Sequence, residues 1–140
     1  MTDNKALTDS FWNLFESNRL DELDPMIDPD CHFKMPGAEL NGRAAVKQLL
    51  TAYRVAFPDL KHHVKSHVSA GDTIAIELEV TGTHTGPMQT AQGTIPATGK
   101  RVTWESCDYV RTKNGRIASW HVYHDPAPFF AALGVTPGAH

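Results

Sequence analysis

Apolar side chains in the first part of the chain recur at the spacing of one helix face. The pattern predicts a helix over residues 5–17, a shorter helix over residues 20–27, and a third helix from Asn41-Gly42, with Asn41 a candidate N-cap, to Pro58. Proline follows the second and third patterns closely, and a residue before proline avoids the helical conformation. A short edge strand over residues 31–35 fits between them. We therefore expect three helices before the main run of strands.

From Leu60 onward apolar residues occupy every second position, which is the period of a strand. The alternation predicts strands over residues 60–68, 73–84, 101–112 and 116–124, a loop over residues 86–99 and a closing helix over residues 126–133. Three helices followed by a four-stranded meander predict an α+β fold. We expect one domain over residues 1–140, in which a curved antiparallel sheet, a cone or half-barrel, carries the three N-terminal helices on its concave face and encloses a ligand pocket.

The charge balance argues against nucleic-acid binding. The 140 residues include 13 Lys and Arg against 16 Asp and Glu, so no basic excess is present to face a phosphate backbone. No apolar run reaches the about 20 residues that cross a bilayer, and the first residues lack a secretory signal pattern. We expect a cytoplasmic protein without a membrane partner. Neither the two cysteines, expected to be reduced, nor the eight histidines show metal-ligand spacing, so no metal site is predicted.

The C-terminal half contains a series of short segments whose order and spacing are informative: Gly82-Thr83-His84-Thr85-Gly86, Ile95-Pro96-Ala97-Thr98-Gly99-Lys100-Arg101-Val102, Asp108-Tyr109-Val110-Arg111, Asn114-Gly115-Arg116-Ile117, Trp120 ahead of Asp125, and Leu133-Gly134. In these segments the chain resembles the SnoaL-like polyketide cyclases of the nuclear-transport-factor-2-like superfamily. The resemblance implies a curved sheet around a pocket, in a homodimer or higher homo-oligomer that pairs outer sheet faces. It also implies acid–base chemistry with neither a metal nor an organic cofactor.

In the cyclase members of that family, an aspartate on the last strand removes an α-proton from a polyketide, and the enolate closes a ring by aldol addition. The matching position here is Asp125, which makes it the predicted general base, although an Asp before proline also commonly caps a turn. His121 shares strand parity with Asp125 and is the predicted partner that orients the carboxylate or acts as the acid. The side chains predicted to bind the substrate are His84 at the rim, Trp12, Tyr53, Trp104, Tyr109 and Tyr123.

The strand register at Asn114-Gly115 decides which side chains share a face with these residues. A three-residue turn with a bulge pairs Cys107 with His121 and turns Cys107 and Tyr109 inward. A two-residue turn shifts the register by one and puts Asp108 opposite His121. We favour the bulged turn because it places Tyr109 on the face of Asp125.

Together these features favour a small enzyme that abstracts or transfers a proton on a hydrophobic metabolite carrying a carbonyl group. The resemblance names ring closure of a polyketide-like ester, and isomerisation, dehydration or hydration would use the same arrangement. The alternative is a non-catalytic module of the same fold that binds a small ligand or dimerises. Fold resemblance alone does not decide between the two.

Overall fold

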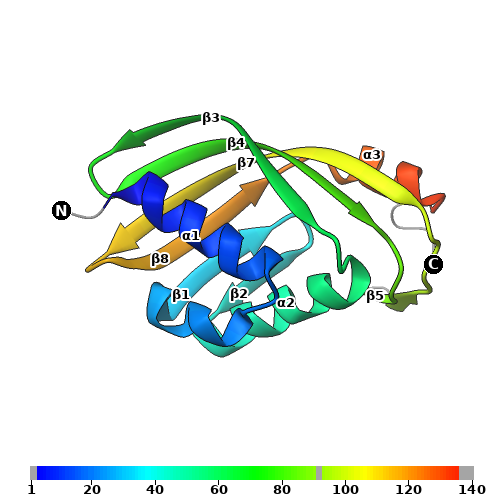
Figure 1. The fold of residues 1–140 in the computed structure, drawn as a ribbon, viewed down its shortest axis with the longest axis horizontal. Coiled ribbons are helices and arrows are strands. Elements are labelled where there is room, and N and C mark those ends of the chain that lie inside the picture. Colours follow the sequence, from blue (N-terminus) through cyan, green and yellow to red (C-terminus); the bar gives the residue numbers. More distant parts are fainter. Residues whose placement is uncertain (1–2, 91–92, 136–140) are drawn as a thin grey trace.

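The computed structural model describes residues 3–90 and 93–135, and its longest strands form one curved, open sheet (Figure 1). Its elements in chain order are α1 (Asn4–Glu16), the 3-10 helix η1 (Leu20–Met26), β1 (Ile27–Met35), β2 (Ala38–Asn41), α2 (Arg43–Ala56), β3 (Lys61–Ala70), β4 (Thr73–Thr83), β5 (Met88–Thr90), β6 (Gly93–Ile95), β7 (Arg101–Lys113), β8 (Arg116–Tyr123) and α3 (Pro126–Leu133). The α+β class and the curved sheet are thus confirmed.

The six-stranded sheet has the order β2-β1-β8-β7-β4-β3 and is mixed rather than wholly antiparallel. The exception is β1, which runs parallel to β8, the last strand of the chain. A long connection separates the two strands, so no tight hairpin forces them to be antiparallel. Because β1 pairs with β8 on one side and with β2 on the other, β1 is internal and β2 takes the edge, which corrects the predicted edge strand over residues 31–35.

Of the three predicted N-terminal helices, the second differs from the prediction in its type. The prediction for α1 is confirmed, and Asp3 caps it by accepting a hydrogen bond from the backbone N–H of Ala6 at 3.1 Å. The second helix is a 3-10 helix that contains Pro25, a residue that has no N–H for an α-helical hydrogen bond. The third, α2, is confirmed, but its N-cap is Gly42 at φ 96° without a side-chain bond, while Asn41 belongs to β2.

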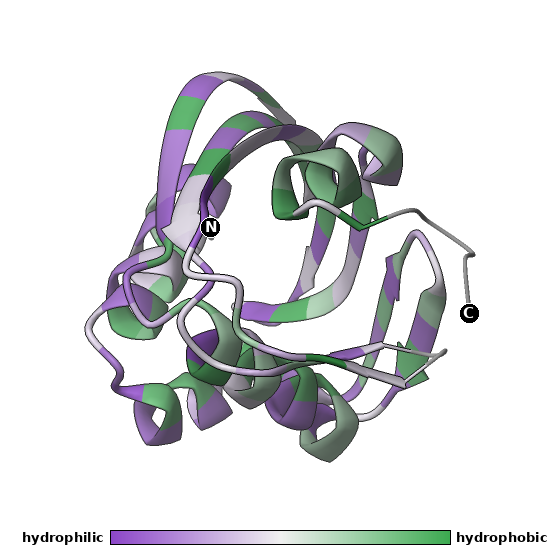
Figure 2. Ribbon diagram, turned by 90° about the vertical axis from the view of Figure 1, so that its right-hand side faces the viewer, coloured by the Kyte–Doolittle hydropathy of each residue, from purple (hydrophilic) through white to green (hydrophobic). Residues whose placement is uncertain are grey.

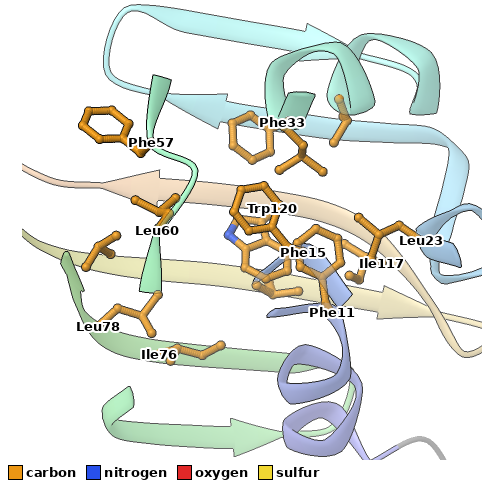
Figure 3. Close-up of a cluster of buried hydrophobic side chains, with 14 of the residues drawn as sticks. Phe11, Phe15, Leu23, Phe33, Phe57, Leu60, Ile76, Leu78, Ile117 and Trp120 are labelled. Carbon is orange, nitrogen blue, oxygen red and sulfur yellow. The ribbon is translucent and has the colours of Figure 1, made fainter. Parts of the chain in front are cut away.

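Alternation along β4 and β7 builds the concave face of the sheet. Apolar residues on this face are buried, and Figure 3 shows Ile76 and Leu78 among the core side chains together with Phe11, Phe15 and Trp120. Figure 2 shows the sheet curling over the helices, with hydrophobic and hydrophilic positions alternating along its strands. A space lined by both layers follows from this curvature.

The β7–β8 turn has the register predicted for a two-residue turn, but farther along the two strands neither predicted register is correct. Asn114 and Gly115 have φ values of 54° and 76°, so they form a two-residue turn of the kind that favours Asn-Gly. The register then shifts between Arg111 and Thr112, after which Tyr109 pairs with His121. As in the register that we favoured, Cys107, Tyr109 and His121 therefore lie on one face of the sheet. This face is the outer one, away from the helices.

Residues 86–99 were expected to be a loop, but they contain a small hairpin of β5 and β6. Over the part of the chain that the structure describes, no helix is both long enough and apolar enough to span a membrane.

Candidate active site

A partly enclosed cavity of about 90 Å³ lies between the concave face of the sheet and the helices. Phenylalanine, leucine, isoleucine and valine side chains from α1, α2 and the sheet form most of its wall. Its polar lining comes from a few side chains: His62, Ser106, Asp108 and His124. Polar groups in such a wall are few but can orient a ligand.

Asp108 is the buried acid of this cavity. It lies on β7 and is 2% exposed. One carboxyl oxygen accepts a hydrogen bond from Ser106 Oγ at 3.0 Å, and the other accepts one from Trp120 Nε1 at 2.8 Å. Burial raises the pKa of Asp108 to about 6, although the hydrogen bonds from Trp120 and Ser106 act in the opposite direction. A carboxylate with such a pKa takes up and releases a proton near neutral pH.

His62, on β3, is the second titratable group of the cavity that has a defined partner. Its backbone N–H donates to Glu16 Oε2 at 2.8 Å, and its ring Nδ1 lies 3.1 Å from the same oxygen. The ring stacks on Trp12, with centroids 3.6 Å apart and planes 15° from parallel. Burial lowers the pKa of His62 in spite of Glu16, so the ring is neutral at pH 7.

Two buried nitrogen atoms on residues that line the cavity are without a hydrogen-bond partner among the described residues. They are Nε1 of Trp12 and Nδ1 of His124. A buried polar group without a partner costs about 1–3 kcal/mol.

Three of the side chains predicted to bind the substrate line the cavity: Trp12, Tyr53 and Trp104. The Tyr53 hydroxyl lies 3.9 Å from Met35 Sδ, and burial raises the pKa of Tyr53 to about 12, so this phenol stays protonated. The substrate-binding roles themselves stay predictions.

The structure does not bring Asp125 and His121 to the cavity. Asp125 is exposed and caps α3, where its Oδ1 accepts from the backbone N–H of Ala127 at 3.0 Å. His121 Nε2 lies 2.9 Å from Nδ1 of His32 on the neighbouring strand, and the other nitrogen of His32 lies 3.5 Å from Glu39. The predicted catalytic roles of the two residues stay predictions, without support from this placement.

The three remaining predicted residues also lie away from the cavity. Tyr109 and Tyr123 are 38% and 54% exposed. His84 is fully buried, but its Nδ1 bonds Thr98 Oγ1 at 3.0 Å, which joins the two ends of the segment that carries β5 and β6. The inward placement of Tyr109 was wrong because parity shows which residues share a face but not which face is buried.

The sequence contains a signal for Asp108 that the predicted site does not use. Val102, Trp104 and Val110 alternate along β7 in step with Asp108, and an acid in phase with apolar residues belongs to the buried face. In the same way, His62 lies between Leu60 and Val64 at a spacing of two. The bond from Trp120 to Asp108 and the contact with Glu16 join distant segments, and no local pattern indicates them.

Cysteine and metal chemistry are not indicated within residues 3–90 and 93–135. In that part of the chain, no group of three or more His, Cys, Asp or Glu side chains is placed to hold a metal ion. Cys31 and Cys107 are free thiols. Burial raises the pKa of Cys31 to about 11, which keeps this cavity-lining thiol protonated and unreactive.

The model of the SnoaL-like polyketide cyclase family matches residues 5–133. The chain belongs to this family. AclR of Streptomyces galilaeus, a proposed hydroxylase, is 26% identical to this SnoaL-like chain, with a TM-score of 0.78 over 93% of this chain and 94% of the other. None of the curated proteins matches the chain in sequence.

Two further solved structures show the same fold at lower identity. IdmH of Streptomyces antibioticus, a proposed polyketide cyclase, is 23% identical with a TM-score of 0.76, over 94% of this chain and 98% of the other. An LEH-like epoxide hydrolase of M. tuberculosis is 18% identical with a TM-score of 0.71, over 91% and 86% of the two chains. At these identities the likeness concerns the fold, and related folds carry different chemistries.

Proposed function

We propose that this SnoaL-like protein is an acid–base enzyme that acts on a hydrophobic carbonyl compound, with Asp108 as the general base. The carboxylate removes a proton from the carbon next to a carbonyl group. The enolate carbon then attacks a second carbonyl of the same molecule, so that a carbon–carbon bond closes a ring. Isomerisation or dehydration would begin with the same proton removal.

The observation that carries the proposal is the environment of the Asp108 carboxyl group. It is buried in an apolar cavity, and its two oxygens each accept one hydrogen bond from a fixed donor. Donors to a carboxylate stabilise its charged form, while burial makes that charge a stronger base than it would be in water. Asp125, by comparison, is exposed at the start of α3.

The cavity wall supports a substrate that is apolar but carries oxygen. The polar side chains of the wall, His62, Ser106, Asp108 and His124, would contact the oxygen atoms of such a substrate. The volume of about 90 Å³ is below the about 300–1,000 Å³ of pockets that enclose drug-sized ligands. A substrate with several rings would therefore enter with only one part enclosed, or with movement of the lining side chains.

Other expectations remain proposals beside this one. We expect one domain over residues 1–140, a cytoplasmic location and a homodimer or higher homo-oligomer. We expect neither a nucleic-acid partner nor a cofactor. The second candidate function, a non-catalytic binding module, would need the same cavity but no proton transfer at Asp108.

Hydrogen–deuterium exchange tests the proposal directly. The probes are aromatic polyketide methyl esters that carry a β-keto side chain, incubated in D₂O with the wild-type protein, Asp108→Asn or Asp125→Asn. We expect Asp108→Asn to slow deuterium incorporation at the α-carbon by about 10²–10⁴-fold, as measured by mass spectrometry. Asp125→Asn should keep the wild-type rate, since Asn caps a helix as well as Asp does.

The opposite result would transfer the role of base to Asp125, in agreement with the family resemblance. If the esters bind the wild-type protein and no exchange occurs above the solvent rate, the protein is a binding module and the proposal is wrong. Thermal unfolding of each variant shows whether a lost rate reflects a lost fold.

A further inference from the structure

We propose that His62 carries a proton within the cavity and that Glu16 is its positioning residue. The inference rests on the proposed function, because it needs a substrate in the same cavity, but it concerns a different step. Asp108 takes the proton from carbon. His62 delivers a proton to the oxygen on which negative charge develops when the ring closes.

The Glu16 carboxylate contacts both the backbone and the ring of His62. Its Oε2 faces both the backbone N–H and the ring Nδ1 of His62, at 2.8 and 3.1 Å. Burial alone would raise the pKa of Glu16, but the hydrogen bonds from His62 outweigh it and hold the pKa below its ordinary value. An ionised carboxylate only accepts hydrogen bonds, so Nδ1 of His62 must carry a hydrogen.

The other ring nitrogen of His62, Nε2, is free to contact a molecule in the cavity. A neutral imidazole with its hydrogen on Nδ1 has a lone pair on Nε2. None of the described residues hydrogen-bonds Nε2 of His62, and the ring lines the cavity. Nε2 is therefore the atom that meets a bound molecule, and it is prepared to accept a proton.

The His62 ring is stacked on the indole ring of Trp12. With centroids 3.6 Å apart, the indole face holds the ring in one plane, and Phe15 adds an edge contact at 5.7 Å. A proton taken up at Nε2 makes the ring a cation. The electron-rich indole face and the Glu16 carboxylate both stabilise that cation, so the ring can hold a proton briefly although it is neutral at rest.

Other charged or titratable groups surround the pair without replacing it. Asp108 and His124 line the same cavity. Lys61 Nζ lies 4.0 Å from Glu16 on the exposed side, and the guanidinium of Arg54 lies over the Phe15 ring at 5.9 Å. Burial lowers the pKa of His62 from its ordinary value and raises that of Asp108 to about 6, and both shifts favour the uncharged form of each side chain.

The proton balance of the proposed step is complete without a further reactant. A C–H bond breaks and its proton goes to the Asp108 carboxylate. The enolate carbon bonds to the second carbonyl carbon, whose oxygen becomes an alkoxide. Nε2 of His62 takes the proton from Asp108 and gives it to the alkoxide, so that both side chains return to their starting forms.

An activity-independent experiment tests the Glu16–His62 pair. Nitrogen-15 NMR of the histidine rings reports which ring nitrogen carries the hydrogen and the pH at which each ring titrates. We expect His62 to carry its hydrogen on Nδ1, and Glu16→Gln to lower the pKa of His62, since the carboxylate raises it. A hydrogen on Nε2 in the wild-type protein, or an unchanged pKa in Glu16→Gln, would overturn the inference.

A kinetic experiment separates this inference from the proposed function. With the β-keto ester probes, His62→Asn should leave deuterium exchange at carbon in place and slow ring closure by about 100-fold. Glu16→Gln should slow closure by a smaller factor, on the order of tenfold. His63→Asn is the matched control, because His63 is the next residue on β3 and is exposed; both of its rates should equal those of the wild type.

Each other outcome has a defined meaning. If His62→Asn loses exchange as severely as Asp108→Asn, His62 is not a carrier that acts after proton removal, and the inference is wrong. It is also wrong if closure is unaffected in both His62→Asn and Glu16→Gln. If His62→Asn does not fold, Glu16→Gln decides the question, since it preserves the shape of the side chain. Loss of exchange in Asp125→Asn but not in Asp108→Asn would overturn the proposed function instead.

Discussion

The two faces of β7 and β8 carry similar residue types in opposite environments. On the concave face, Asp108 and Trp120 are 2% and 3% exposed and bond to each other. On the outer face, the neighbouring residues Tyr109 and His121 pair across the same two strands, and Tyr109 is 38% exposed. One step along a strand separates the two sets. The comparison teaches that burial, more than residue type, decides which groups acquire unusual acid–base behaviour.

His62 lines the cavity and His121 lies on the outer face, and the charges around the two rings differ. His62 meets the carboxylate of Glu16 inside the fold. On the outer side, burial lowers the pKa of His121, the neighbouring His32, Lys34 and Arg111 lower it further, and only Glu39 raises it. A negative partner prepares a ring to hold a proton, whereas positive neighbours oppose it. The concave face is therefore better suited to proton transfer.

The largest effect that would test this comparison is the pH dependence of stability. The pKa of Asp108 in the folded protein is about 6, whereas an unfolded Asp has a pKa of about 3.9. Between these values the folded protein holds a proton that the unfolded chain has released. The free energy of unfolding therefore decreases by about 3 kcal/mol as the pH rises from about 4 to above about 6.

Asp108→Asn should remove this decrease, because an amide does not titrate. Urea unfolding of both proteins at a series of pH values gives the difference, in which the other titrating groups cancel. Parallel curves for the two proteins would show that Asp108 titrates normally. The contrast between the two faces would then fail.

Trp120→Phe should have the next largest effect. It removes the Nε1–H donor of Asp108 and part of a buried ring. We expect a loss of about 2 kcal/mol in the free energy of unfolding at pH 7, measured by urea unfolding. The pKa of Asp108 should also rise, since the bond from Trp120 lowers it; carbon-13 NMR of the carboxyl group would detect this. An unchanged pKa would contradict the proposed control of Asp108 by Trp120.

The smallest effect is expected on the outer face. Tyr109→Phe removes a hydroxyl group from a partly exposed ring that lies 5.7 Å from the guanidinium of Arg111. We expect the free energy of unfolding to change by no more than about 0.5 kcal/mol. The same urea unfolding experiment checks this value. A larger loss that depends on protein concentration would instead indicate that a second copy of the chain covers this face, as the expected homodimer would.

Periodicity predicted the fold better than it predicted the site. The stripe from Leu7 to Phe15 and the alternation along β4 located α1 and β4 within a residue or two, because local burial imposes these periods. The family resemblance also agreed with the family model. The parallel pairing of β1 with β8, by contrast, joins the beginning and the end of the chain, and no local pattern contains that information.

The site prediction failed at one identifiable step. The predicted strand parity of Asp125 with His121 does not apply, because β8 ends at Tyr123 and Asp125 is the N-cap of α3. Asp108 alternates along β7 in step with Val102 and Val110, so the sequence indicates that it lies on the buried face. Its raised pKa depends on how completely that face is buried, which the sequence does not give. Of the six predicted substrate-binding side chains, Trp12 of α1, Tyr53 of α2 and Trp104 of β7 line the cavity.

The sequence by itself determined the α+β class, the two main helices, the long strands and the family, since these depend on local periodicity and on short motifs. Only the tertiary structure decided which face of β7 and β8 is enclosed. It alone brought Glu16 to His62 and Trp120 to Asp108. The physical reason is that desolvation and hydrogen-bond partners arise from segments far apart in the chain, and these set the proton affinity of a side chain.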